Sequence, residues 1–247
     1  MMQRCFSRRI GTFHQLTTNL AQCVSESVAS GRTALIAPQQ QVLYCYGDLD
    51  DRARRLATGL IELGYEPGAV IVSNIPNISE NLILQLALSH IGGALATPRK
   101  GEDLQALTSK YNVLGAICCD DGSEAQEWAQ GHRLPTISLG EQPPNDSPTV
   151  TFDELIACPP RREDPTSTGA TLLGIFGSAM VTNGEAISLG RAAASRLGTQ
   201  QTDRTCVSVT LCHAFGIGSA ATSAFSSGGA CVLPAVGGIR GCGDPQQ

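Results

Sequence analysis

In residues 46–98, segments with a helical period alternate twice with short apolar runs. This alternation constrains the fold more than any other feature of the sequence. A run of apolar β-formers at 69–73 is typical of a buried strand, and 94–97 predicts a second one. Between them, 78–90 is apolar nearly all round and predicts a helix enclosed in a core. The first helix has apolar residues on one face, namely Leu49, Ala53, Leu56, Leu60 and Leu63. Strand, helix and strand with short links imply a right-handed crossover, so the predicted fold class is α/β with layered parallel sheet.

Two local patterns refine this prediction. The polar face of the first helix carries Asp50, Asp51, Arg54 and Arg55, and charges spaced in this way predict a solvated surface. Asn77 is followed three residues later by Glu80, which resembles a capping box at the start of the second helix.

Composition excludes several classes of function. The net charge is −5, so there is no basic surplus to neutralise the phosphates of a nucleic acid. No apolar run is long enough to cross a bilayer, and we expect membrane contact only through a partner complex. Ten cysteines are present, but Cys206, Cys212 and His213 lack the paired C-x-x-C spacing of a zinc site. We therefore expect no metal site.

The first 25 residues contain no Asp or Glu, and they contain Arg4, Arg8 and Arg9 among Ser, Thr and apolar residues. This composition is typical of a mitochondrial or plastid transit peptide, and we expect mitochondrial localisation. An ordinary basic N-terminal helix is the alternative.

Four short segments of the chain also match a known pattern. They read Tyr46-Gly-Asp-Leu-Asp-Asp-Arg-Ala, Leu63-Gly-Tyr-Glu-Pro-Gly, Asn74-Ile-Pro-Asn and Gly92-Gly-Ala-Leu-Ala-Thr-Pro. Together they resemble the opening of the AMP-forming acyl-CoA synthetases, the adenylate-forming superfamily. The resemblance implies the first half of that family's large domain, because its later motifs and its small C-terminal domain have no counterpart in this sequence.

The resemblance also locates a degenerate phosphate loop. The family has Tyr-Thr-Ser-Gly-Thr-Thr-Gly-x-Pro-Lys-Gly-Val, whose backbone N–H groups, hydroxyls and lysine hold the phosphates of ATP. The corresponding positions here are Gly177, Ser178, Thr182, Asn183 and Gly184, with Asn183 in the place of the lysine. The resemblance therefore implies a vestigial loop, no catalytic residue and no bound cofactor.

A second motif is better preserved. Residues 210–216 resemble the family's Pro-Leu-Phe-His-x-x-Gly, which implies that His213, Phe215 and Gly216 are the remains of an acyl pocket. His213 is either a substrate-site residue or a satisfied histidine at a strand end. Alternation predicts a strand at 205–211, and an apolar run predicts another at 230–234.

The expected organisation has five parts, with prolines concentrated in the middle. It comprises a transit-like segment at 1–24, a first α/β lobe at 25–140, a proline-rich irregular connection at 141–164, an incomplete second lobe at 165–238 and a flexible tail at 239–247.

These features favour a structural function. The leading hypothesis is a catalytically inactive acyl-CoA synthetase-like protein that serves as an accessory subunit of a larger mitochondrial complex, such as a respiratory complex, the ATP synthase or the mitochondrial ribosome. Whether the chain is an enzyme stays open. One alternative is a fragment of an AMP-forming acyl-CoA synthetase that activates a carboxylic acid with ATP, and another is a regulatory module that binds an acyl group or a nucleotide.

Overall fold

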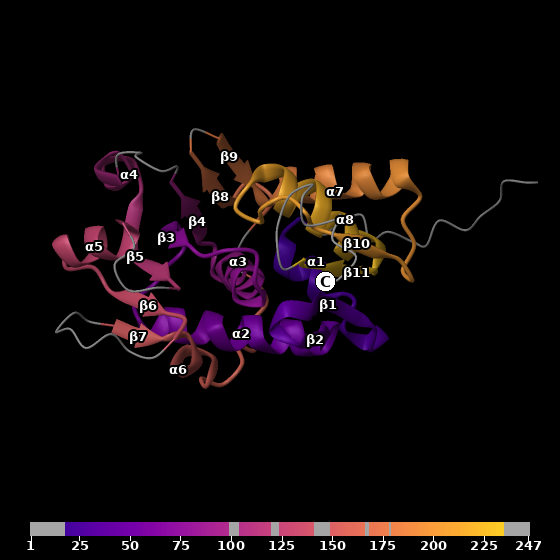
Figure 1. Ribbon diagram of the computed structural model, residues 1–247, viewed down its shortest axis with the longest axis horizontal. Helices are drawn as coiled ribbons and strands as arrows, with labels where there is room; N and C mark the ends of the chain where they lie inside the picture. The colour runs from indigo at the N-terminus through magenta and orange to yellow at the C-terminus, as the bar shows by residue number, and fades with distance from the viewer. Residues whose placement is uncertain are drawn as a thin grey trace, which may run out of the picture.

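The computed structural model describes residues 18–98, 104–119, 124–140, 149–165, 168–177 and 179–234. These residues form two β-sheets and the helices that pack between and around them (Figure 1). The fold is α/β with layered parallel sheet, as the alternation of helical and strand patterns predicts. Residues 1–17 and the expected tail at 239–247 lie outside the described residues.

The larger sheet has seven strands in the order β7-β6-β5-β3-β4-β8-β9. Its neighbouring strands are parallel except for β8 and β9, which form an antiparallel hairpin. The strands are β3 (Ala69–Asn74), β4 (Ala94–Thr97), β5 (Asn112–Cys118), β6 (Thr136–Ser138), β7 (Thr149–Thr151), β8 (Leu172–Phe176) and β9 (Ala179–Thr182). The predicted unit of strand, helix and strand at its centre is confirmed, with α3 (Ser79–Ile91) between β3 and β4.

The smaller sheet combines the two ends of the described chain. Its order is β10-β11-β1-β2, formed by β10 (Arg204–Cys206), β11 (Ala230–Val232), β1 (Thr33–Ala37) and β2 (Val42–Cys45). Parallel pairing of β1 with β11 places Leu35 opposite Cys231. The expected division into lobes at 25–140 and 165–238 is therefore wrong for the sheets, because each sheet takes strands from both parts of the sequence.

The remaining helices are α1 (Leu20–Ser25), α2 (Tyr46–Glu62), α4 (Leu104–Lys110), α5 (Glu124–Gly131), α6 (Phe152–Ile156), α7 (Asn183–Leu197) and α8 (Thr222–Ser227). Two 3₁₀ turns, η1 (Val28–Ser30) and η2 (Pro38–Gln40), and one π-helix, η3 (Phe215–Ala221), complete the structure. None of the helices in the described ranges is long and apolar enough to cross a membrane.

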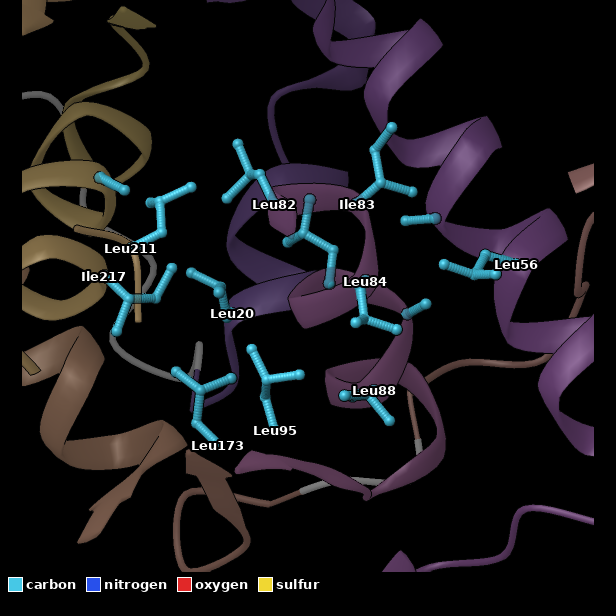
Figure 2. Packing of buried hydrophobic residues seen from close by; sticks show 14 of the residues in the cluster. Leu20, Leu56, Leu82, Ile83, Leu84, Leu88, Leu95, Leu173, Leu211 and Ile217 are labelled. Carbon is cyan, nitrogen blue, oxygen red and sulfur yellow. The ribbon is translucent and has the colours of Figure 1, made fainter. Parts of the chain in front are cut away.

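Helix α3 lies at the centre of the molecule, and every one of its residues except Glu80 is buried. In Figure 2, Leu82, Leu84 and Leu88 extend from α3 into the core cluster. Leu56 of α2 approaches from one side of the helix, while Leu20, Leu211 and Ile217 approach from the other. The predicted enclosure of this helix is confirmed.

The predicted capping box before α3 does not form. The N-cap is Ile78, whose side chain makes no capping bond. Gln40 supplies the cap instead, because its Oε1 accepts from the Ser79 N–H at 2.7 Å and its Nε2 donates to Glu80 at 2.7 Å. Asn77 turns away to the segment after β10, and its Oδ1 accepts from the Leu211 N–H at 2.7 Å.

The same contact explains why the strand predicted at 205–211 is short. Its regular pairing ends at Cys206, apart from one further bond from the Val207 N–H to the Val232 carbonyl at 2.8 Å. The chain then leaves the sheet, where Asn77 Nδ2 donates to the Val209 carbonyl at 3.0 Å. A long-range side-chain contact therefore replaces the ladder.

The charged face of α2 is more than a solvated surface. Arg54 donates to the carbonyl of Arg161 at 3.2 Å, and Arg55 donates to the carbonyl of Cys158 at 3.1 Å. Asp50 orients Arg54 through a 2.6 Å ion pair. These side chains hold residues 158–163 against α2. The connection expected to be irregular, 141–164, contains regular structure just before them, in β7 and α6.

Candidate functional site

The positions expected to form a phosphate loop are divided between a tight hairpin and a helix start. Phe176 pairs with Ala179 across β8 and β9, so two residues connect these strands. Gly177 has a positive φ of 62°, which a glycine adopts without strain, and its N–H donates to the Thr97 carbonyl at 3.3 Å. Ser178 lies outside the described residues.

Thr182 is the N-cap of α7 and forms a complete capping box. Its Oγ1 accepts from the Glu185 N–H at 3.2 Å, and Glu185 Oε2 accepts from the Thr182 N–H at 2.8 Å. The Thr182 N–H and the Thr182 hydroxyl both donate to the Glu185 carboxylate, and these two bonds lower the pKa of that carboxyl below its ordinary value. A carboxylate of this chain therefore lies at the helix end that would otherwise attract an anion.

Asn183 points into the protein and is fully buried. Its Oδ1 accepts from the Leu20 N–H at 3.0 Å and from Ser89 Oγ at 2.9 Å. Its backbone N–H donates to the Thr171 carbonyl at 2.9 Å. The side chain that takes the place of the family's lysine thus joins α1, α3 and α7, and it does not face solvent.

Gly184 closes the helix end against residue 169. Its N–H donates to the Gly169 carbonyl at 2.8 Å, and a Cβ at position 184 would lie 2.8 Å from that same oxygen. The four backbone N–H groups from 182 to 185 all donate within the protein. Because a phosphate needs free N–H donors, this arrangement cannot accept one without opening the contact.

The second motif forms a turn that leads into η3. His213 is exposed, and its Nδ1 accepts from the Phe215 N–H at 3.1 Å. The side chain of Phe215 is 56% exposed. Gly216 is buried, and a Cβ there would lie 2.0 Å from the Thr210 carbonyl oxygen. In this turn the glycine permits close backbone packing, while the histidine stabilises the turn and the phenylalanine faces outward.

A row of buried polar side chains on α3 is the feature that sequence reasoning missed. Asn81 Nδ2 donates to Cys212 Sγ at 3.2 Å, Gln85 Nε2 donates to the Leu211 carbonyl at 3.3 Å, and Ser89 reaches Asn183. The spacing of four residues within an apolar helix was the available signal. These residues attach the second motif and the start of α7 to the central helix.

The described residues contain no cluster of side chains suited to a metal ion. A cavity of about 410 Å³ lies at the amino ends of β3, β4 and β8 and is lined in part by Val70, Ala94, Tyr111 and Leu172. Gly177, by contrast, follows the carboxyl end of β8, the edge at which open α/β sheets bind ligands. The cavity and the predicted site therefore lie at opposite ends of these strands.

Residues 24–108 match the AMP-binding enzyme family. Over 92 residues the chain is 35% identical to YngI of Bacillus subtilis, which carries the name of an acyl-CoA synthetase, and this alignment covers 36% of the chain and 17% of that protein.

One similar solved structure is that of the anthranilate CoA ligase AuaEII in complex with anthranoyl-AMP. It is 16% identical to this chain with a TM-score of 0.76, and the match covers 90% of this chain and 46% of that one. A benzoate CoA ligase from Burkholderia xenovorans is 20% identical with a TM-score of 0.71, over 88% of this chain and 45% of that one. The chain thus spans about half the length of the solved structures that it resembles.

Proposed function

We propose that this chain does not activate carboxylic acids. It has the fold of the adenylate-forming acyl-CoA synthetases, and its residues 24–108 match the AMP-binding enzyme family. Its function is structural: it is an accessory subunit of a larger assembly in mitochondria. Candidates for this assembly are a respiratory complex, the ATP synthase and the mitochondrial ribosome.

The observation that carries the proposal is the closed start of α7. The N–H groups of residues 182–185 donate within the protein, the Glu185 carboxylate accepts from the Thr182 N–H, and Asn183 is buried. Opening this end would also strain the fully buried Asn183, and a buried group that loses its hydrogen-bond partner costs about 1–3 kcal/mol. Without donors and a cation at the phosphates, the charge that develops in adenylate formation is not stabilised.

Exposed apolar side chains support a role in protein contacts. Met180 on β9, Leu189 and Leu197 on α7, and Phe215 on η3 are 56%, 45%, 78% and 56% exposed. Strand β9 and η3 both pack against α7, and exposed apolar side chains on adjoining elements favour an interface with another protein. The N-terminal composition, with three arginines and no acids, supports the mitochondrial location.

The test is ATP–pyrophosphate exchange with a panel of aliphatic and aromatic carboxylic acids. An authentic acyl-CoA synthetase assayed in parallel serves as the positive control. We expect no exchange above the level without enzyme, and no shift of the melting temperature at millimolar ATP. A ligand at a hundred times its Kd would stabilise the fold by about 2.7 kcal/mol, which a melting curve resolves easily.

The family match itself favours a second candidate, an AMP-forming acyl-CoA synthetase of which these residues form part. Exchange that requires a particular carboxylic acid and falls in a Ser178→Ala variant would support this activity and refute the structural proposal. A saturable shift of the melting temperature without exchange would instead support the regulatory module.

Location and partners need their own experiment. A fluorescent reporter fused to residues 1–17 should enter mitochondria, and replacement of Arg4, Arg8 and Arg9 by glutamine should leave it in the cytosol. Gentle purification of the native protein should then recover stoichiometric partner subunits. Recovery of the chain alone from mitochondria would contradict the accessory role.

A further inference from the structure

The segment after the basic N-terminal residues is part of the folded core. Leu20, Ala21 and Val24 of α1 are at most 1% exposed. Figure 2 shows Leu20 between the leucines of α3 and the side chains of Leu211 and Ile217. The sequence pattern had included these residues in a transit-like segment at 1–24, but the structure assigns 19–24 to the interior.

Hydrogen bonds also hold this segment in place. The Leu20 N–H donates to Asn183 Oδ1 at 3.0 Å, and the Ala21 N–H donates to Ser89 Oγ at 3.2 Å. Asn19 caps α1, because its Oδ1 accepts from the Gln22 N–H at 2.8 Å, and it is only 3% exposed. Thr18, one residue earlier, is exposed.

We propose that the N-terminal leader is removed by a peptidase that cuts on the N-terminal side of Asn19, so that α1 is retained in the mature protein. A protease requires its substrate backbone to be accessible, and bonds within packed structure become accessible only through local opening. Hydrolysis adds one water across a peptide bond and yields the carboxylate of the released leader and the ammonium of the new N-terminus. The limit, meaning that the cut lies no further along the chain than the bond before Asn19, rests on the structure. The removal of the leader rests on the proposed mitochondrial location.

Two truncations test the limit directly in the otherwise full chain. Deletion of residues 2–17 should leave the urea midpoint of unfolding unchanged, whereas deletion of residues 2–25 should lower it strongly or abolish cooperative unfolding. Equal midpoints for the two truncations would overturn the limit.

Chymotrypsin provides a test that does not require truncation. The bond after Leu20 should stay intact in the native chain, because Leu20 is buried and its N–H is bonded to Asn183. In an Asn183→Ala variant the cleavage rate at this bond should rise by about a hundredfold, because the Leu20 N–H and Ser89 lose their buried acceptor and α1 opens more often. Asn77→Ala is the matched control, because Asn77 contacts residues 207–211 instead of α1. Cleavage after Leu20 in the native chain at the rate of the variant would overturn the limit.

Import of the full chain into isolated mitochondria tests the removal itself. The intact mass of the recovered protein should correspond to a new N-terminus at or before Asn19. A new N-terminus after Asn19 overturns the limit, and recovery of the uncut chain overturns the removal of the leader. Failure of import instead refutes the proposed location and with it the removal, while the truncation and chymotrypsin results still decide the limit.

Discussion

Replacing Asn183 by alanine should destabilise the fold by about 3 kcal/mol. The substitution removes the acceptor of the Leu20 N–H at 3.0 Å and of Ser89 Oγ at 2.9 Å, at a position with no solvent exposure. A buried polar group that loses its partner costs about 1–3 kcal/mol, and the smaller side chain also leaves a cavity. Ser89 Oγ still accepts from the Ala21 N–H at 3.2 Å. Losing the bond between Asn183 and Ser89 therefore costs less than losing the bond between Asn183 and Leu20.

Urea unfolding measures this cost. With a slope of about 3 kcal/mol/M, a loss of about 3 kcal/mol lowers the midpoint by about 1 M. Ser188→Ala is the control, because Ser188 is exposed on the same helix and should change stability by less than about 0.5 kcal/mol. The double variant Asn183→Ala, Ser89→Ala should be less destabilised than the sum of the single changes, because the two residues share a hydrogen bond. A loss below about 1 kcal/mol, or additive effects, would refute the role assigned to Asn183.

Three further changes test other parts of the structure. Asn183→Lys should not restore pyrophosphate exchange and should destabilise the fold more than Asn183→Ala, because it buries a charge. Burial lowers the pKa of His90 from 6.5 to about 4. As the pH falls, His90 therefore binds a proton in the unfolded state before it does so in the folded state. The free energy of unfolding should therefore fall by up to about 3 kcal/mol as the pH decreases from 6.5 to 4, and His90→Gln should flatten this part of the curve. Gly216→Ala places a Cβ 2.0 Å from the Thr210 carbonyl oxygen and should cost about 1–3 kcal/mol in urea unfolding, whereas Gly131→Ala, with open space around it, should not.

Each of these predictions has a clear contrary result. Exchange in Asn183→Lys would show that the helix end can open to phosphate. Equal dependence on pH in the wild type and His90→Gln would show that His90 is not the group that titrates. Equal stability of the Gly131 and Gly216 variants would show that the turn can shift.

The part of the fold that sequence predicted well is the part fixed by local periodicity. Leu49, Leu56 and Leu60 place one face of α2 in the core, and the unit of β3, α3 and β4 follows directly. The pairing of β1 with β11 could not be predicted in this way, because nothing local in the sequence around Leu35 specifies Cys231 as its partner.

Prediction of the candidate site was limited for the same reason. Position alone placed Asn183 in a phosphate loop, but the partners of its side chain are Leu20 and Ser89, which are distant in sequence. Asn77 and Glu80 satisfy the local rule for a capping box, yet Gln40 supplies the cap and releases Asn77 to hold Leu211. The whole N-terminal composition resembled a leader, although apolar packing assigns Leu20 and Val24 to the core.

The smaller sheet has a consequence for how this chain folds. Strand β1 lies between β2 and β11, so during synthesis its pairing edge has to wait until residues 230–232 have left the ribosome. Contacts between such distant residues carry a large loop-closure entropy and slow folding. A chain synthesised at about 5–20 residues per second thus spends about ten seconds or more with that edge unpaired. This interval is long enough for a chaperone, or a translocation machinery that needs an unfolded chain, to act before the sheet closes.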